Sequence, residues 1–192
     1  MRGAAPLLLA LDTSTRTVGV ALYDGAQVLS EMVWTSRDYH TVELAPAVSD
    51  ALRRAGVTMD AVAAVGVAIG PGSFTGLRVG LALAKGLVMA RRLALIGAPT
   101  LDALAAAQPV FESPLVAALR AGRGRLAAQW YRVAAGEWQP FGKVQVYTLD
   151  ELAKKIETPT LVCGEFSAEE REALVSQQPH ARLVSPAQSL RR

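Results

Sequence analysis

One segment of the sequence has residue types and spacing that could do chemistry: Gly-Pro-Gly-Ser-Phe-Thr-Gly at positions 70–76. Before it comes an uncharged, valine-rich run, 61–69, of the kind that forms a strand buried on both faces. Proline ends strand pairing, and Ser73 or Thr75 can cap a helix that follows. N–H groups and the positive end of the helix dipole would point outward at such a turn, so it could bind an anion.

The glycine spacing leaves two interpretations of this turn open. A P-loop that starts at Gly70 needs a second glycine at position 75, where the chain has Thr75, and a lysine directly after it. The dinucleotide pattern also needs glycine at position 75, and Gly76 comes one residue late. The turn is therefore either an atypical anion site or a plain connection between strand and helix.

The helix after the turn carries a second pattern. Gly76, Gly80 and Ala84 recur at intervals of four and form a stripe with little side-chain volume, next to larger residues such as Leu81. A glycine inside a helix costs about 0.5–1 kcal/mol relative to alanine. Two of them indicate that another backbone packs closely against the helix, and this backbone belongs either to the same chain or to a partner.

Other common catalytic sets are missing from the sequence. The two histidines, His40 and His180, are far apart and have no cysteines or paired carboxylates at ligand spacing, so we expect no metal centre. Cys163 is the only cysteine, which excludes an internal disulfide, and no Gly-x-Ser-x-Gly motif is present. We expect His40 to cap or pack at the start of a helix.

Composition predicts a cytoplasmic globular protein. Hydrophobic residues make up 51% of the 192 residues, the net charge is +3, and the charges are dispersed along the chain. The longest uncharged stretch, 61–77, is interrupted by Gly, Pro, Ser and Thr, and we expect it not to span a membrane. The apolar run near the N-terminus meets Asp12 early, which fits a first strand better than a secretion signal.

One local group of cations stands out: Arg120, Arg123 and Arg125. The glycines between them predict a hairpin turn, which would place the guanidinium groups on an exposed tip. Such a tip could contact RNA phosphates, because Arg binds them in a bidentate way. A few arginines at a turn can equally be a solvated edge.

Hydrophobic periodicity predicts the elements that position these residues. The first half predicts strands at 7–12, 18–23, 27–34, 61–69 and 93–96, with helices at 41–55, at 74–91 and from Pro99. The second half predicts strands at 115–120, 126–133, 143–147 and 160–163, with helices at 149–156 and 168–176. Three strands followed by alternating helices and strands indicate an α/β fold with a mixed sheet. We predict two lobes, 1–108 and 109–192, each with a mixed sheet flanked by helices, the second being abbreviated.

Several ordered motifs resemble a known family. The segment 70–80, followed by Ala-Lys-Gly at 84–86 and preceded by Leu-Ala-Leu-Asp-Thr-Ser-Thr at 9–15, is similar to the bacterial TsaB (YeaZ) family of tRNA threonylcarbamoyladenosine biosynthesis proteins. The similarity includes His40-Thr41 and Pro-Thr-Leu-Asp-Ala-Leu at 99–104, so it covers roughly the first half of the chain in order. The resemblance implies an actin-like ATPase (ribonuclease H-like) fold, the ASKHA superfamily.

The resemblance also implies which residues descend from a nucleotide site. In such an ATPase the first phosphate loop would comprise Asp12, Thr13, Ser14, Gly72 and Ser73 of this chain. In the second lobe the chain has Arg120 where the family more often has Asp, and a cation there would repel Mg²⁺. No Gly-Gly adenine platform is evident. We therefore expect a vestigial phosphate loop with no catalytic residue, cofactor or metal.

The function implied by the resemblance is that of an accessory subunit. The family accompanies TsaD, which transfers a threonylcarbamoyl group to tRNA, and the ATPase TsaE joins the pair, so tRNA would be met indirectly through the complex. Helices 41–55 and 74–91 would then bind TsaD, and the same surface could form a homodimer in isolation. The expected partner-binding residues are Leu44, Val48, Leu52, Gly76, Gly80, Leu81 and Ala84.

Two alternatives from other classes remain. The chain could be a small actin-fold ATPase or kinase that acts as a homodimer, in which case it would bind ATP with Mg²⁺. It could also be an RNA-binding module that uses the tip from Arg120 to Arg125, in which case its RNA affinity would fall steeply with salt.

Overall fold

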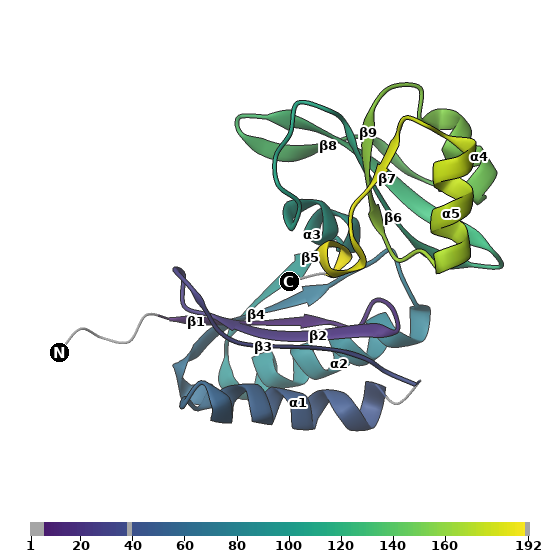
Figure 1. Ribbon diagram of the computed structural model, residues 1–192. Helices are drawn as coiled ribbons and strands as arrows, with labels where there is room; N and C mark the ends of the chain where they lie inside the picture. The colour runs from purple at the N-terminus through teal and green to yellow at the C-terminus, as the bar shows by residue number, and fades with distance from the viewer. Residues whose placement is uncertain (1–5, 38–39, 191–192) are drawn as a thin grey trace. The chain divides into compact units, whose positions relative to one another are not determined.

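The computed structural model describes residues 6–37 and 40–190, and along them the chain forms two compact units that divide between Thr100 and Leu101 (Figure 1). Each unit contains a five-stranded mixed sheet with helices packed on it. The predicted α/β architecture of two lobes is confirmed.

The sheet of the first unit has the strand order β3-β2-β1-β4-β5. β1, β2 and β3 form an antiparallel meander, and β4 and β5 continue the sheet parallel to β1. Helices α1 and α2 lie side by side on one face of this sheet (Figure 1). The strands are β1 Leu7–Asp12, β2 Thr17–Tyr23, β3 Val28–Thr35, β4 Val62–Ala68 and β5 Ala94–Ala98; the helices are α1 His40–Arg54, the short 3₁₀ turn η1 Met59–Ala61 and α2 Phe74–Arg91.

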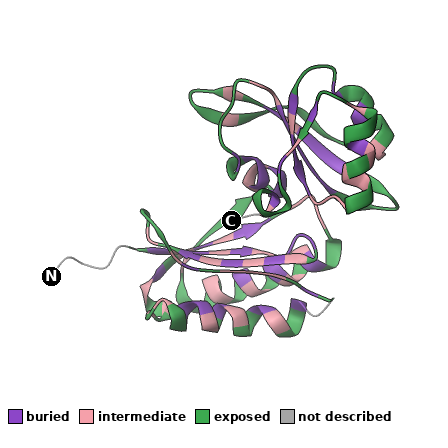
Figure 2. Ribbon diagram, viewed as in Figure 1, coloured by how far each residue is buried: buried purple, intermediate pink, exposed green. Residues whose placement is uncertain are grey.

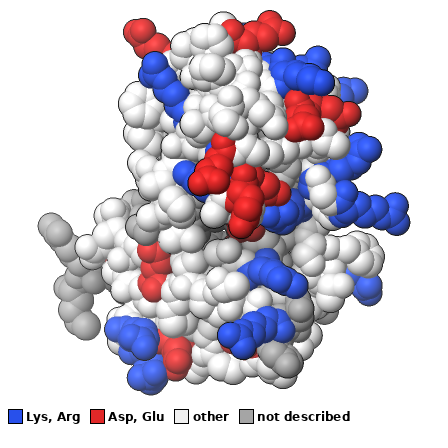
Figure 3. All heavy atoms as spheres, turned by 45° about the vertical axis from the view of Figure 1, so that its right-hand side comes forward, with Lys and Arg blue, Asp and Glu red and all other residues white. Residues whose placement is uncertain are grey.

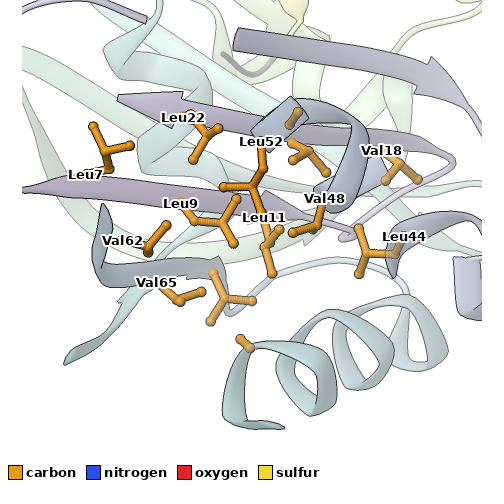
Figure 4. Close-up of a cluster of buried hydrophobic side chains, with 14 residues drawn as sticks. Leu7, Leu9, Leu11, Val18, Leu22, Leu44, Val48, Leu52, Val62 and Val65 are labelled. Atoms are coloured by element: carbon orange, nitrogen blue, oxygen red, sulfur yellow. The ribbon is translucent and has the colours of Figure 1, made fainter. Parts of the chain in front are cut away.

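The core of the first unit forms because one face of the sheet meets one side of each helix. Leu7, Leu9 and Leu11 alternate along β1 with less buried residues, so they share the face covered by the helices. Figure 4 shows these leucines together with Leu44 and Leu52 of α1, and Figure 2 shows how the buried positions follow the inner side of the helices. Complete burial of a leucine contributes about 1.5–3 kcal/mol, so this cluster dominates the stability of the unit.

The second unit repeats the layered arrangement with the strand order β10-β9-β6-β7-β8. Leu152 and Leu174, from α4 and α5, pack on one face of its sheet, and α3 packs on the other. Its strands are β6 Leu115–Gly122, β7 Arg125–Ala134, β8 Glu137–Tyr147, β9 Thr160–Gly164 and β10 Ala181–Leu183; its helices are α3 Thr100–Ala106, α4 Leu149–Lys155, α5 Ala168–Gln177 and the 3₁₀ turn η2 Pro186–Ser189. The sequence did not predict β10 or η2, and it predicted β8 to begin at 143 rather than 137.

The division between the units lies earlier than residue 108, where the sequence placed it. Helix α3 supplies Leu101 and Leu104 to a cluster with Leu115 of β6. In addition, the hydroxyl of Tyr131 donates a hydrogen bond of 2.7 Å to the carboxylate of Asp102. These contacts attach α3 to the second sheet, so the helix counts with the second unit.

None of the helices in the described part of the chain has the length and hydropathy needed to cross a bilayer.

Candidate functional site

The turn after β1 and the glycine-rich turn before α2 are packed directly against each other. The backbone N–H of Ser73 donates to the carbonyl oxygen of Ser14 at 2.6 Å, and the Thr13 hydroxyl donates to the carbonyl oxygen of Gly76 at 2.7 Å. Hydrogen bonds therefore join the segments 12–15 and 70–76, both of which the sequence singled out.

Three glycines are required by this close approach. A Cβ atom added to Gly72 would lie 2.2 Å from the carbonyl oxygen of Ser14, and one added to Gly76 would lie 2.2 Å from that of Thr13. A Cβ atom on Gly80 would lie 2.3 Å from the Thr13 hydroxyl oxygen. The backbone that the glycine stripe of α2 accommodates is thus the turn after β1 in the same chain.

The polar groups of the expected phosphate loop bond to one another. Asp12 accepts hydrogen bonds from the backbone N–H and the hydroxyl of Ser14, at 2.7 and 2.6 Å. The hydroxyl of Ser73, the residue that caps α2, accepts a 3.2 Å hydrogen bond from the N–H of Gly76. The N–H groups of Ser14 and Gly76, which would bind phosphate in a nucleotide site, are thus used within the turn, and both hydrogen bonds to Asp12 end on Oδ1. A vestigial origin of the loop stays a prediction.

The structure corrects the set of residues expected to face a partner. The side chains of Leu44, Val48, Leu52 and Ala84 belong to the core of the first unit, and Leu81 packs against the same core. Gly76 and Gly80 are buried against the turn after β1. These residues lie on the sheet-facing sides of their helices, because the helices use their most apolar and smallest residues to cover the sheet. Of the set, only Leu44 also reaches the surface groove described next.

A groove of about 540 Å³ runs between α1 and α2 on their solvent side. It is lined by Thr41, Leu44, Ala45, Thr75, Arg78, Val79, Ala82 and Leu83. Beside it, the solvent side of α2 carries Phe74, Thr75, Arg78, Ala82, Lys85, Gly86 and Met89, which we call the outer face of α2.

The outer face of α2 combines large exposed apolar groups with a glycine that no other part of the described chain packs against. Phe74 is 75% exposed and Met89 is 80% exposed. The Arg78 guanidinium lies 5.2 Å from the centroid of the Phe74 ring. Gly86 is exposed, and a Cβ atom added there would find nothing within 4 Å. Sequence reasoning missed Ala82 and Gly86 because the buried stripe of glycines dominated the helical pattern.

The isolated histidine and cysteine are structural. His40 is buried, with its Nε2 atom 3.1 Å from the carbonyl oxygen of Thr15. Burial raises the pKa of the Cys163 thiol, which disfavours the reactive thiolate. Among residues 6–37 and 40–190, no group of His, Cys, Asp or Glu side chains is arranged to hold a metal ion.

The predicted arginine tip is a tight hairpin turn between β6 and β7. Arg123 and Gly124 form the turn with φ of 51° and 69°, and both Arg123 and Arg125 are exposed. Arg120 instead pairs with Glu170 of α5 at 2.7 Å. Basic and acidic side chains alternate over the face shown in Figure 3, which carries no large patch of one sign.

Comparison with known proteins relates the chain to tRNA modification. A family model described as "TsaD: tRNA N6-adenosine threonylcarbamoyltransferase" matches residues 27–184. The Bacillus subtilis tRNA threonylcarbamoyladenosine biosynthesis protein TsaB is 30% identical over 160 residues, which is 82% of this chain and 70% of that protein. The Escherichia coli TsaB protein is 37% identical over 98 residues, which is 51% of this chain and 42% of that protein. The match thus spans less than half the length of the Escherichia coli relative.

Solved structures agree with this relationship. YeaZ from Pseudomonas aeruginosa superimposes with a TM-score of 0.70 and 29% identity, covering 82% of this chain and 75% of that chain. A Bacteroides thetaiotaomicron protein described as having an actin-like ATPase fold gives a TM-score of 0.52 at 9% identity, covering 96% of this chain and 93% of that chain, and it supports the fold alone. The chain has an actin-like ATPase fold and belongs to the TsaB (YeaZ) family of tRNA threonylcarbamoyladenosine biosynthesis proteins.

Proposed function

We propose that the chain is a non-catalytic subunit of the tRNA N6-threonylcarbamoyladenosine modification complex in the cytoplasm. In this proposal it binds and supports the TsaD transferase, the ATPase TsaE joins the pair, and tRNA is met only through the assembled complex. The observation that carries the proposal is the outer face of α2 beside the α1–α2 groove, which exposes the large apolar side chains of Phe74 and Met89 and has the small residues Ala82 and Gly86 between them.

The geometry of that surface favours a helix as its occupant. Ala82 lines the groove and Gly86 follows it one helical turn later, so a neighbouring backbone can approach α2 closely there. An exposed glycine in a helix interior costs about 1 kcal/mol relative to alanine. The contacts that would offset this cost are absent within the described chain, which supports a partner at Gly86.

The hydrogen bonds of the expected phosphate loop support a non-catalytic role. Asp12 and the N–H groups of Ser14 and Ser73 form hydrogen bonds within the turn after β1 and the glycine-rich turn. In the second unit, by itself, the exposed Arg120 pairs with Glu170. No cofactor is required for a subunit that acts by binding. In isolation, the same outer face could join two copies of this chain, because a symmetric contact uses one surface twice.

The experiment is a calorimetric titration of TsaD from the same organism into variants of the chain. Gly86→Leu places a bulky side chain on the proposed contact and should weaken binding about tenfold or more. Ser176→Leu makes a comparable change at an exposed position on α5 of the second unit and should leave binding unchanged. Equal binding of both variants would contradict the surface. Gly80→Leu is unsuitable, because it would collide with Thr13 and damage the fold.

The competing function is an actin-fold ATPase or kinase that acts as a homodimer, favoured by the fold alone. Titration with ATP, with and without Mg²⁺, separates the two functions. The proposal predicts no Mg²⁺-dependent binding by the chain alone, because the N–H groups of Ser14, Ser73 and Gly76, which would bind phosphate, already donate hydrogen bonds within the turn. Tight, Mg²⁺-dependent binding would favour the enzyme.

A further inference from the structure

We infer that the partner helix that occupies the outer face of α2 carries carboxylates opposite Arg78 and Lys85, and that these two cations disfavour a symmetric pair of this chain. The inference rests on the proposed function and adds the chemistry that selects one partner over another.

The charges of α2 have a single sign. Between Phe74 and Arg91 the helix contains Arg78, Lys85 and Arg91 and no acidic residue. Arg78 and Lys85 are seven residues apart, which places them on the same side of the helix, and both are exposed. Arg91 is paired with Asp60 at the far end of the helix. Within the described chain, no ion pair joins Arg78 or Lys85 to an acidic side chain.

The acidic residues of the neighbouring helix point elsewhere. Glu43 of α1 accepts a 3.0 Å hydrogen bond from the indole N–H of Trp34, which lies in β3. This bond, helped by Ser36, lowers the pKa of the Glu43 carboxyl. Asp50 lies on the same flank of α1 as Glu43, seven residues later, and pairs with Arg53 at 2.7 Å. Neither carboxylate belongs to the groove lining that Arg78 shares.

A symmetric pair would therefore bring like charges together. A two-fold contact places the same patch on both sides, so two copies would contribute four cations and no carboxylates to the outer faces of α2. A helix with carboxylates at the matching positions would gain attraction instead, which also accelerates association. Rejecting one partner by repulsion while attracting another is an established route to specificity.

The test measures two associations at about 50 mM and about 500 mM NaCl, where screening of exposed charges differs strongly. One is the affinity for TsaD from the same organism, by calorimetry; the other is self-association, by sedimentation. Raising the salt should weaken the TsaD complex and strengthen the homodimer.

Arg78→Glu with Lys85→Glu should weaken TsaD binding about tenfold or more. Mixed with the unaltered chain, the same variant should form a mixed pair tighter than either homodimer.

The control reverses two charges away from the surface: Lys154→Glu with Lys155→Glu, in α4 of the second unit. It should leave both associations unchanged. If charge reversal on α2 and salt change neither association while Gly86→Leu still weakens TsaD binding, the groove is correct and this inference is overturned. If the unaltered chain does not bind TsaD at either salt concentration, the proposed function fails, and this inference fails with it.

Discussion

The hydroxyl oxygen of Thr13 lies 2.3 Å from the point that a Cβ atom on Gly80 would occupy. The same hydroxyl donates to the carbonyl oxygen of Gly76, one turn earlier in α2. Thr13 therefore fills the space that two glycines leave open, and the turn after β1 is locked to the helix. The segment whose sequence looks most like a phosphate loop therefore packs against α2 inside the first unit.

This relationship predicts opposite effects for the same substitution at two glycines of α2. Gly80→Ala should destabilise the protein by about 1–3 kcal/mol, because the new methyl group overlaps the Thr13 hydroxyl. Gly86→Ala should stabilise it by about 0.5–1 kcal/mol, because the position is open and alanine favours a helix. Urea denaturation of the two variants measures both effects.

A double variant checks the cause of the first effect. Thr13→Ala removes the hydroxyl, so the penalty of Gly80→Ala should shrink in the Thr13→Ala background, giving a coupling of about 0.5–3 kcal/mol. If the two penalties simply add, the overlap is not the cause.

Much of the fold was predictable from the sequence because its signals are local. The apolar run before Gly70 predicts β4, and the strand patterns at 18–23 and 27–34 predict β2 and β3. The glycine stripe was also visible, but its orientation was not. The residue that fills it, Thr13, lies 63 residues before Gly76, and no local pattern shows which distant turn packs on a helix. For that reason the expected partner-binding residues fell on the buried side of α1 and α2.

Attachment of α3 to the second unit should depend on Tyr131. Its hydroxyl donates to Asp102 in a nearly inaccessible position, and burial, with Asp102, raises its pKa. Tyr131→Phe leaves the ring but removes the hydrogen bond, so we expect a loss of about 1–3 kcal/mol in the free energy of unfolding. In hydrogen exchange, the backbone amides of α3 should be the first to lose protection. Unchanged protection of α3 would mean that the bond does not hold this helix.

Cys163 should react slowly with alkylating reagents as long as the second unit is folded. Burial raises the pKa of its thiol, so at pH 8 the folded protein contains less thiolate than an ordinary cysteine does. We expect alkylation by iodoacetamide at pH 8 to be at least about a hundredfold slower than for the unfolded chain. Rapid labelling of the native protein at pH 8 would contradict the buried position.

A contact of the hairpin tip with RNA stays a prediction, and it has a direct test. Arg123→Ala with Arg125→Ala should preserve the fold, because Ala135 and Gly136 form the equivalent turn between β7 and β8 with φ of 53° and 79°. If the tip binds phosphates, the salt dependence of tRNA binding by the complex should lose about one unit of slope per arginine. An identical slope would mean that the tip is a solvated edge.

Reconstituted modification of tRNA tests the central claim most directly. Threonylcarbamoyladenosine would be measured in tRNA incubated with the threonylcarbamoyl-adenylate donor, TsaD and TsaE from the same organism, with this chain added, omitted, replaced by Gly86→Leu or supplied alone. The account predicts product only when TsaD and the unaltered chain are both present, with a strong loss for Gly86→Leu. Product from the chain without TsaD, or equal product from TsaD and TsaE without the chain, would contradict it.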